Sequence, residues 1–373
     1  MRVIIRVVIK KMFEASLKVL EKIESHGYKA YIVGGFVRDY ILGIESTDVD
    51  ISTNATPKDI LDIFKDSALP NEEYGAVTLF YKNNRYEITT FRREIRYINN
   101  RKPIEIEYID DLLEDLQRRD FKMNTLCIDK KGNIIDLLEG REDIDNHIIN
   151  TVGDSDYKFE QDSLRILRAI RFATTLDFEL SDDVKNSIIK HKASLRTLSY
   201  SRKKQELDKI FASSNSSYGV SLLMALGLDE DLELYGLDKV VLNSDLLGVW
   251  ASIDFASGYQ FSSNEMNLIK SIKEVVNNKI DELTLFKYGL YVNQEAANIL
   301  GVDKSLVASM YENLPIYTRK DIAVSSEDIM KALDKKAGPY FKDMYNDLIE
   351  KILKGELSNN KEDIINYVID NYK

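Results

Sequence analysis

The stretch GGFVRDYILGIESTDVDISTNATP, residues 34–57, decides the fold and indicates the chemistry. Gly34 and Gly35 close an apolar run and open a short helical pattern, so a strand, a tight turn and a helix are predicted in that order. Asp48 and Asp50 stand two apart in an alternating segment, which places both carboxylates on one face of a predicted strand, about 7 Å apart along the chain. Such a pair can share divalent ions, and a backbone without Cβ atoms can approach a phosphate chain.

Each of these two features also has an ordinary structural explanation. A pair of aspartates in an acidic protein is commonly a solvated strand face, and two glycines at a strand end are commonly only a turn. A metal site is the other interpretation of the aspartates, because Mg²⁺ prefers few carboxylates plus substrate phosphate oxygens. Two such ions stabilise both the attacking and the leaving oxygen of a phosphoryl transfer.

Helical and strand patterns surround this stretch. We predict helices over residues 12–26, 36–44 and 57–65, and strands over residues 29–35, 47–53, 76–81 and 85–91. Together they form a small mixed α/β sheet domain. From about residue 158 onward the apolar residues recur at helical spacing, which predicts an all-helical remainder. Residues 1–9 are interpreted as a strand or tail, or as an upstream start ahead of Met12.

The composition is that of a globular protein of two or three domains. The chain has 373 residues, of which 44% are hydrophobic and 30% charged, and no apolar run is long enough for a membrane span. The single cysteine allows no internal disulfide, and the three histidines have no zinc-ligand spacing, so we expect a cytoplasmic protein without zinc. The net charge of −11 is uneven: residues 157–210 hold 12 basic and 8 acidic residues, whereas residues 211–373 hold 16 and 25. Phosphate binding depends on this distribution rather than on the sum.

Three further segments concentrate arginines beside carboxylates: YEITTFRRE (86–94), DLQRRDFKMNTL (115–126) and FEQDSLRILRAIRFA (159–173). An arginine can hold triphosphate oxygens, and an Asp or Asn can hydrogen-bond ribose hydroxyls. In the last segment a helical wheel that begins at Asp162 puts three arginines, spaced three apart, opposite an apolar face. A helix cap in the second segment and a solvated amphipathic helix in the third are the structural alternatives.

Taken together, the motifs resemble the polymerase-β-like nucleotidyltransferases, in the family of class II tRNA nucleotidyltransferases (CCA-adding enzymes) and bacterial poly(A) polymerases. The resemblance covers about residues 28–212. It implies an α/β nucleotidyltransferase head (residues 1–150), followed by an all-α neck that templates the nucleotide (151–214) and a helical body and tail that bind tRNA (215–373). The implied reaction is template-independent addition of CCA to the 3′ end of tRNA from CTP and ATP, with Mg²⁺ and release of pyrophosphate.

The resemblance also implies roles for individual residues. Asp48 and Asp50 would hold Mg²⁺, and Glu87 is either a third metal-site carboxylate or structural. Asp162 would accept from the amino group of cytosine or adenine while Arg165 donates to the adjacent ring nitrogen; uracil and guanine invert this pattern. The other expected nucleotide-binding residues are Gly35, Arg38, Arg119, Asp120, Asn124, Arg168 and Arg171.

The sequence departs from the family pattern at two places. Gln161 stands where the family usually has Glu, which predicts a weaker hold on Arg165, and the common H-G-T-V reads YGAV at residues 74–77. The segment between Phe91 and Arg118 is full length, which disfavours a CC-adding enzyme. An A-adding enzyme, a poly(A) polymerase and a non-catalytic RNA-binding module are the remaining alternatives.

Overall fold

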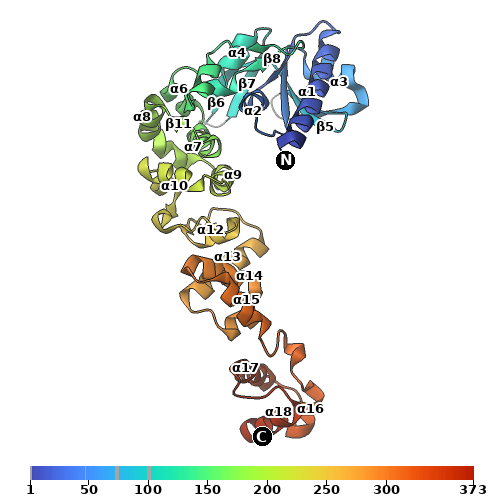
Figure 1. The fold of residues 1–373 in the computed structure, drawn as a ribbon, viewed down its shortest axis with the longest axis vertical. Helices are drawn as coiled ribbons and strands as arrows, with labels where there is room; N and C mark the ends of the chain where they lie inside the picture. Colours follow the sequence, from blue (N-terminus) through green and yellow to red (C-terminus); the bar gives the residue numbers. More distant parts are fainter. Residues whose placement is uncertain (1, 47, 72–74, 99–101) are drawn as a thin grey trace. The chain divides into compact units, whose positions relative to one another are not determined.

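The computed structural model describes residues 2–46, 48–71, 75–98 and 102–373 (Figure 1). The chain divides into two compact units, Met1–Glu233 and Leu234–Lys373. The first unit contains the head sheet and the helices that follow it, and the second contains the remaining helices. Tyr74 of the YGAV segment and part of the segment between Phe91 and Arg118 lie outside the described residues.

A 7-stranded mixed sheet forms the head, in the order β3-β4-β5-β2-β1-β8-β9. Its strands are β1 (Ala30–Val33), β2 (Val49–Thr53), β3 (Ala68–Asn71), β4 (Ala76–Tyr81), β5 (Asn84–Thr90), β8 (Cys127–Ile128) and β9 (Ile134–Ile135). Strand β2 runs parallel to β5 and antiparallel to β1, so it lies inside the sheet. The four strands predicted from the sequence are confirmed. A separate antiparallel ladder joins β6 (Arg92–Ile98) to β7 (Lys102–Tyr108).

The helices of the head follow the predicted pattern with one exception. They are α1 (Arg2–Glu24), α2 (Gly35–Leu42), α3 (Pro57–Phe64), α4 (Leu112–Gln117) and α5 (Gly140–Asp145), with 3₁₀ turns at η1 (Lys65–Ser67) and η2 (Lys122–Asn124). Helix α1 begins at Arg2, so the expectation of a strand or tail over residues 1–9 is wrong. No glycine or proline precedes Gly27, and the preference of β-branched residues for strands is too weak to stop a helix by itself.

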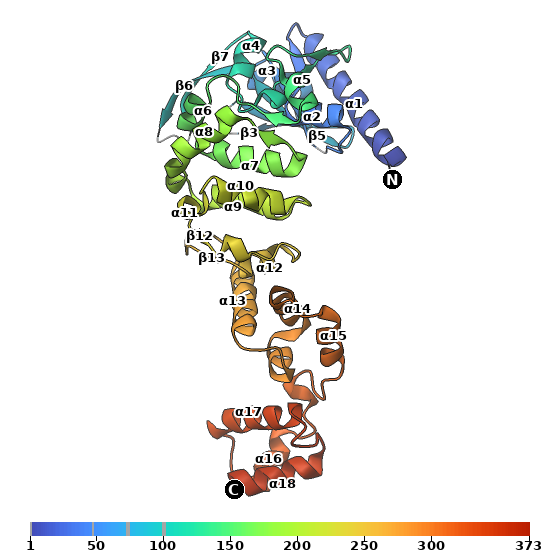
Figure 2. The same cartoon turned by 60° about the vertical axis from the view of Figure 1, so that its left-hand side comes forward.

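After the head, the first unit continues as helices α6 (Ser155–Gln161), α7 (Leu164–Leu176), α8 (Asp182–His191), α9 (Tyr200–Phe211), α10 (Ser216–Ala225) and α11 (Asp229–Leu232), with 3₁₀ helix η3 (Lys192–Thr197). Figure 2 shows α7 between the head and the α9–α10 pair, and α7 packs on both of these helices. The expectation of an all-helical remainder is corrected by two short strand ladders, the first of which lies in this unit. Strand β11 (Glu179–Leu180) pairs in parallel with β10 (Ile148–Ile149), so this part is mostly helical.

The second unit contains α12 (Leu246–Ala251), α13 (Ser263–Asn277), α14 (Glu282–Leu300), α15 (Lys304–Glu312), α16 (Ser326–Leu333), α17 (Tyr340–Leu353) and α18 (Lys361–Tyr372), the 3₁₀ turns η4 (Leu237–Lys239) and η5 (Arg319–Asp321), and one short ladder of β12 (Leu234–Tyr235) with β13 (Asp254–Phe255). Trp250 is fully buried and packs against Phe255 and Tyr259, with ring centroids 5.1 and 5.2 Å away. These aromatic residues therefore form core.

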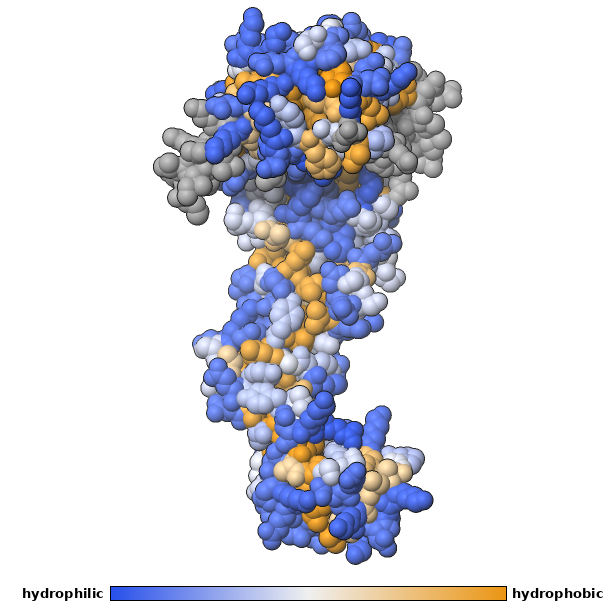
Figure 3. Space-filling model, turned by 90° about the vertical axis from the view of Figure 1, so that its right-hand side faces the viewer, coloured by the Kyte–Doolittle hydropathy of each residue, from blue (hydrophilic) through white to orange (hydrophobic). Residues whose placement is uncertain are grey.

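Hydrophilic side chains cover much of the surface visible in Figure 3, and apolar residues there gather in patches on the head and over the helical part of the chain. Among the described residues, no helix is both long enough and apolar enough to cross a membrane.

Candidate active site

The turn between β1 and α2 brings backbone against the central strand. Gly34 has φ +78°, a conformation that favours glycine, and it precedes the first residue of α2. A Cβ atom at Gly34 would lie 3.4 Å from both Asp50 Oδ2 and Arg119 Nη1. The first N–H groups of a helix have no partner within it, so this turn presents donors beside Asp50. The predicted glycine turn therefore also brings the backbone close to the side chains of Asp50 and Arg119.

Three carboxylates face one cavity of about 630 Å³. Asp50 lies on β2 directly opposite Glu87 of β5, and Asp48 immediately precedes β2. Although solvent reaches Asp50 through the cavity, desolvation by the surrounding protein raises its pKa to about 6. Arg119 opposes this shift, whereas the Glu87 and Asp48 carboxylates add to it. A bound cation would neutralise the negative charge that these three carboxylates place at the cavity.

These carboxylates fit the coordination habits of Mg²⁺. Among the described residues, no three His, Cys, Asp or Glu side chains lie close enough together to enclose a metal ion by themselves. Mg²⁺ usually takes one or two protein carboxylates and completes its octahedral shell with water and substrate phosphate oxygens. The cavity beside Asp48 and Asp50 leaves room for such ligands. Their role as metal ligands stays a prediction.

A chain of polar contacts joins α2 to α7 across the cavity wall. Arg38 Nη1 donates to Asn124 Oδ1 at 2.7 Å, and Asn124 Nδ2 donates to Asp120 Oδ1 at 3.1 Å. Arg168 completes the chain, because its Nε and Nη2 lie 2.7 and 2.6 Å from Asp120 Oδ2. Burial opposes ionisation of Asp120, but Arg168 and Asn124 outweigh it and hold the pKa of Asp120 far below its usual value. Asp120 therefore stays charged and fixes both partners.

Three guanidinium groups surround the ring of Phe172. The guanidinium carbons of Arg38, Arg168 and Arg171 lie 4.9, 5.4 and 3.9 Å from the ring centroid. Arg171 Nε also donates to Glu206 of α9 at 2.5 Å. All three arginines line the same cavity as the carboxylates. One wall of the cavity thus presents three guanidinium groups, each paired with a carboxylate, and guanidinium groups suit a chain of phosphate groups.

The segment that carries the predicted base-reading pair is not one continuous helix. Helix α6 ends at Gln161, Asp162 has an extended backbone (φ −149°, ψ 106°), and α7 begins at Leu164. The prediction of a single helix from Asp162 through the arginines is therefore wrong. The physical reason is local, since Asp162 Oδ1 accepts from the Leu164 backbone N–H at 3.0 Å and so competes with continued helix.

Both members of this pair are held by protein groups. Arg165 is buried and donates to Gln161 Oε1 at 2.8 Å, and also to the backbone carbonyl oxygens of Lys158 and Arg118 at 3.1 and 3.2 Å. Asp162 Oδ2 accepts from Arg202 Nη2 at 2.8 Å. Gln161 thus makes the bracing contact to Arg165 without a charge.

The structure brings most of the predicted site residues to one cavity and leaves two outside it. Asp162 and Arg165 do not line the 630 Å³ cavity. The predicted residues that do line it are Gly35, Arg38, Asp48, Asp50, Glu87, Arg119, Asp120, Asn124, Arg168 and Arg171.

Sequence reasoning missed four further residues that line this cavity. They are Val49, Arg85, Phe172 and Lys209. Phe172 could have been predicted, because it follows Arg171 within the 159–173 motif. No sequence pattern indicated Arg85 or Lys209.

The head belongs to the class of polymerase-β-like nucleotidyltransferases, and three family models match the chain in order. The Poly A polymerase head domain matches residues 30–150. The probable RNA and SrmB-binding site of polymerase A matches residues 177–232, and the putative tRNA nucleotidyltransferase domain 2 matches residues 255–368.

Relatives match the chain over almost its whole length. The CCA-adding enzyme of Staphylococcus haemolyticus is 32% identical over 97% of this chain and 99% of its own. The CCA-adding enzyme of a Geobacillus species is 33% identical over 96% and 97%. The crystal structure of the Bacillus stearothermophilus CCA-adding enzyme in complex with CTP superposes with a TM-score of 0.81 at 28% identity, covering 96% of this chain and 97% of the other. The chain belongs to the family of CCA-adding tRNA nucleotidyltransferases.

Proposed function

We propose that this chain adds C, C and A to the 3′ end of tRNA, taking CTP and ATP and releasing pyrophosphate. The observation that carries the proposal is the 630 Å³ cavity, in which Asp48, Asp50 and Glu87 face a wall that includes Arg38 and Arg171. The relatives that match the whole chain are CCA-adding enzymes, which supports this reaction over other nucleotidyl transfers.

Enzymes of this family are metal dependent, and we propose Mg²⁺ as the ion. Asp48 and Asp50 would hold it, with Glu87 opposite Asp50 on the neighbouring strand. When bound, the ion would activate the 3′-hydroxyl of the RNA and neutralise charge on the α-phosphate. Asp48 and Asp50 would supply the negative charge that binds the ion. Asp50 is held in a fixed position because β2 is an interior strand of the head sheet.

The remaining cavity residues would bind the nucleotide itself. The backbone at Gly34 and Gly35 would donate to phosphate oxygens, and Arg38 and Arg171 would neutralise them. Asn124 and Asp120 lie between Arg38 and Arg168 in the chain of contacts, where a ribose hydroxyl would exchange hydrogen bonds with them. Binding and orientation of the triphosphate would then account for most of the catalysis, as in other phosphoryl transfers.

The parts of the chain beyond the head would select the incoming nucleotide and bind the tRNA. We assign nucleotide templating to residues 151–214 and tRNA binding to residues 215–373. Helices α10 and α11 lie in the first compact unit, which ends at Glu233, so they pack with the neck although they belong to the region assigned to tRNA. The surplus of basic residues over residues 157–210 suits a neck that contacts phosphates.

Base selection is expected to depend on Arg165. In Arg165→Ala, the preference for CTP and ATP over UTP and GTP should fall by about 100-fold, while the rate with the correct nucleotides falls less than about tenfold. In the wild type the buried Arg165 guanidinium would oppose the ring N–H of uracil or guanine. Without Arg165 this opposition is lost, so UTP and GTP are rejected less strongly. The values of kcat/KM for the four nucleotides on tRNA transcripts test this, with Arg141→Ala, an exposed arginine on α5, as control. Undiminished rejection of UTP and GTP would contradict the templating role.

The reaction itself is tested by incorporation of labelled CTP and ATP, alone and together, into tRNA transcripts ending before CCA, after C and after CC. Ordered use of both nucleotides that stops after A is the expected result. Use of ATP only on the CC-ending transcript would instead indicate an A-adding enzyme, and long A tails a poly(A) polymerase. Tight tRNA binding without incorporation would indicate a non-catalytic RNA-binding module.

A further inference from the structure

The second compact unit contains a cavity of its own, of about 390 Å³. Its lining residues come from the β12–β13 ladder, from η4 and from helices α12, α13 and α14, all within residues 234–373. The proposed reaction assigns no individual role to any of them. A cavity of this size can hold a small organic ring with its substituents, so the chemistry of its walls indicates what would enter.

Apolar side chains form the floor of this cavity. Ala251 and Ile253 are buried, and Val276 and Ile299 are half-buried. Trp250, which precedes Ala251, is fully buried in the aromatic core, so the floor rests on a packed part of the unit. A ring that covers such a floor removes apolar surface from water, which favours binding.

Polar side chains surround the floor, and two of them neutralise each other. Lys273 Nζ donates to the Ile253 carbonyl oxygen at 2.6 Å and to Asp254 Oδ1 at 2.5 Å. Asp254 lies opposite Tyr235 in the β12–β13 ladder, and Tyr235 is 56% exposed. Asn277, the last residue of α13, is also exposed. The rim therefore presents an aromatic ring and an amide beside an ion pair that is already complete.

Lys239 supplies the available positive charge of the cavity. It is the last residue of η4, it is exposed, and it makes no ion pair or side-chain hydrogen bond with the part of the chain that the structure describes. A cation without a counter-ion can bind a phosphate without first breaking an ion pair. The charge of this cavity therefore matches one phosphate.

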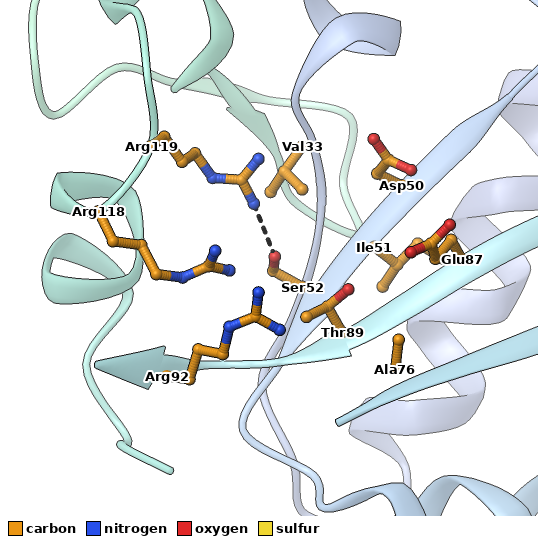
Figure 4. Close-up of a pocket in the computed structure, with 10 residues that line it drawn as sticks. All are labelled: Val33, Asp50, Ile51, Ser52, Ala76, Glu87, Thr89, Arg92, Arg118 and Arg119. Carbon is orange, nitrogen blue, oxygen red and sulfur yellow. Dashed lines mark hydrogen bonds between the residues drawn. The ribbon is translucent and has the colours of Figure 1, made fainter. Parts of the chain in front are cut away.

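The charge of the surrounding unit decides which kind of nucleic-acid contact is favourable here. Residues 211–373, which include the second unit, hold 16 basic and 25 acidic residues, so their net charge repels a phosphate backbone. Figure 4 shows a different lining in a cavity of about 320 Å³ in the first unit, where the guanidinium groups of Arg92, Arg118 and Arg119 gather around Ser52. With one available lysine beside an apolar floor, the cavity of the second unit instead suits a ring that brings a single phosphate.

We propose that this cavity receives one unstacked nucleotide from a loop of the tRNA, with its base on the apolar floor beside Tyr235 and its phosphate at Lys239. Bases in an RNA stem are stacked and paired, so a loop or an end must supply one. The proposed function uses the 3′ end at Asp48 and Asp50 of the first unit, which leaves a loop. The inference rests on that function and specifies how residues 215–373 would bind tRNA.

Tethering favours a nucleotide of the RNA over a free one. A single exposed lysine and one stacking ring bind a free nucleotide weakly, because the whole cost of immobilising it falls on those two contacts. In a tRNA that other parts of the chain already hold, the loop nucleotide arrives at a high effective concentration. The same two contacts then add measurably to the affinity for tRNA.

The test compares two RNAs that differ in their loops. One is a tRNA transcript ending in CC, and the other is the duplex of its acceptor stem, which has the same CC end and no loop. In the full chain, Tyr235→Ala and Lys239→Ala should each weaken binding of the transcript about tenfold and change binding of the duplex less than about twofold. Filter binding at one fixed salt concentration measures both affinities, because contacts to phosphates depend strongly on salt.

Conservative variants and a neighbouring lysine provide the controls. Tyr235→Phe keeps the ring and should keep the wild-type affinity, and Lys239→Arg should recover most of the loss seen in Lys239→Ala. Lys270 is exposed on α13 but does not line the cavity, so Lys270→Ala should not lower binding of the transcript relative to the duplex. The emission of Trp250, the sole tryptophan, should be unchanged in every variant, which shows that this unit stays folded.

Two results would overturn the assignment. An equal loss for the transcript and the duplex in Tyr235→Ala would place a stem, rather than a loop nucleotide, against the ring. Unchanged binding of the transcript in both alanine variants would show that RNA does not enter the cavity. Failure of the proposed function would be seen separately, as a wild type that incorporates neither CTP nor ATP while the two RNAs still report on the cavity.

Discussion

Replacement of Asp48 and Asp50 together by asparagine is expected to abolish nucleotide incorporation, with a loss of about 10⁴-fold or more, and to leave tRNA binding intact. Asparagine keeps the size of each side chain and removes only the negative charge that is proposed to hold the metal. A loss of this size corresponds to about 5.5 kcal/mol of transition-state stabilisation, within the range that bound metal ions supply in phosphoryl transfer. Asp48 is exposed and Asp50 faces the cavity, so the core should be undisturbed.

Single-turnover incorporation of labelled ATP into a CC-ending transcript measures the loss, and filter binding measures the affinity for tRNA. Glu45→Gln is the matched control, because it removes an exposed carboxylate from the loop that leads to Asp48. Its rate should stay near that of the wild type. Turnover retained in the double variant would refute the assignment of these aspartates to the metal.

Asp115→Ala is expected to lower the free energy of unfolding of the first unit by about 3–5 kcal/mol. Asp115 is fully buried, and burial opposes its charge, but Arg118 and Arg119 outweigh this effect and lower its pKa. Removal of the carboxylate leaves these guanidinium groups, each mostly buried, without their shared counter-ion. It also leaves the Arg92 backbone N–H without its acceptor.

The neighbouring Glu114→Ala is the control for this prediction, since Glu114 makes a half-exposed pair with Arg93 that should contribute less than about 1 kcal/mol. Amide hydrogen exchange in urea across β2 and α4 provides the measurement. Fluorescence of Trp250 does not replace it, because this sole tryptophan lies in the second unit. Equal stability of the two variants would show that Asp115 does not organise the arginines.

The sequence predicted those parts of the fold and the site that depend on local spacing. Residues 34–57 contain a turn, a helix and a strand, and each of these elements is confirmed, although the strand contains Asp50 and begins just after Asp48. Strands β1, β2, β4 and β5 were predictable because alternation of apolar residues directly reflects which face is buried, whereas β3, β8 and β9 of the same sheet were not predicted. The start of α1 was mispredicted, since residues 1–9 contain β-branched residues but no helix breaker.

Other parts depend on contacts that no local pattern contains. Asp115 organises Arg92 from 23 positions away in sequence, and Asp162 meets Arg202 on a different helix. The interruption before α7 was also missed, because helical periodicity continues in the sequence through the residues that break it. A helical wheel drawn through Asp162 shows only the direction of each side chain. It does not show that the Asp162 side chain accepts a hydrogen bond from the backbone, which interrupts the helix.

The interruption between α6 and α7 lies beside the residues that are proposed to select the base, which are not the residues that line the cavity with Asp50. Asp162 and Arg165 are held by Gln161, Arg202 and backbone groups, away from the cavity that contains Asp50. On the proposed function, substitutions around residues 158–165 alter nucleotide preference without replacing any residue that lines that cavity. For protein engineering, a library confined to that segment would explore acceptance of modified bases while the strand bearing the aspartates stays constant.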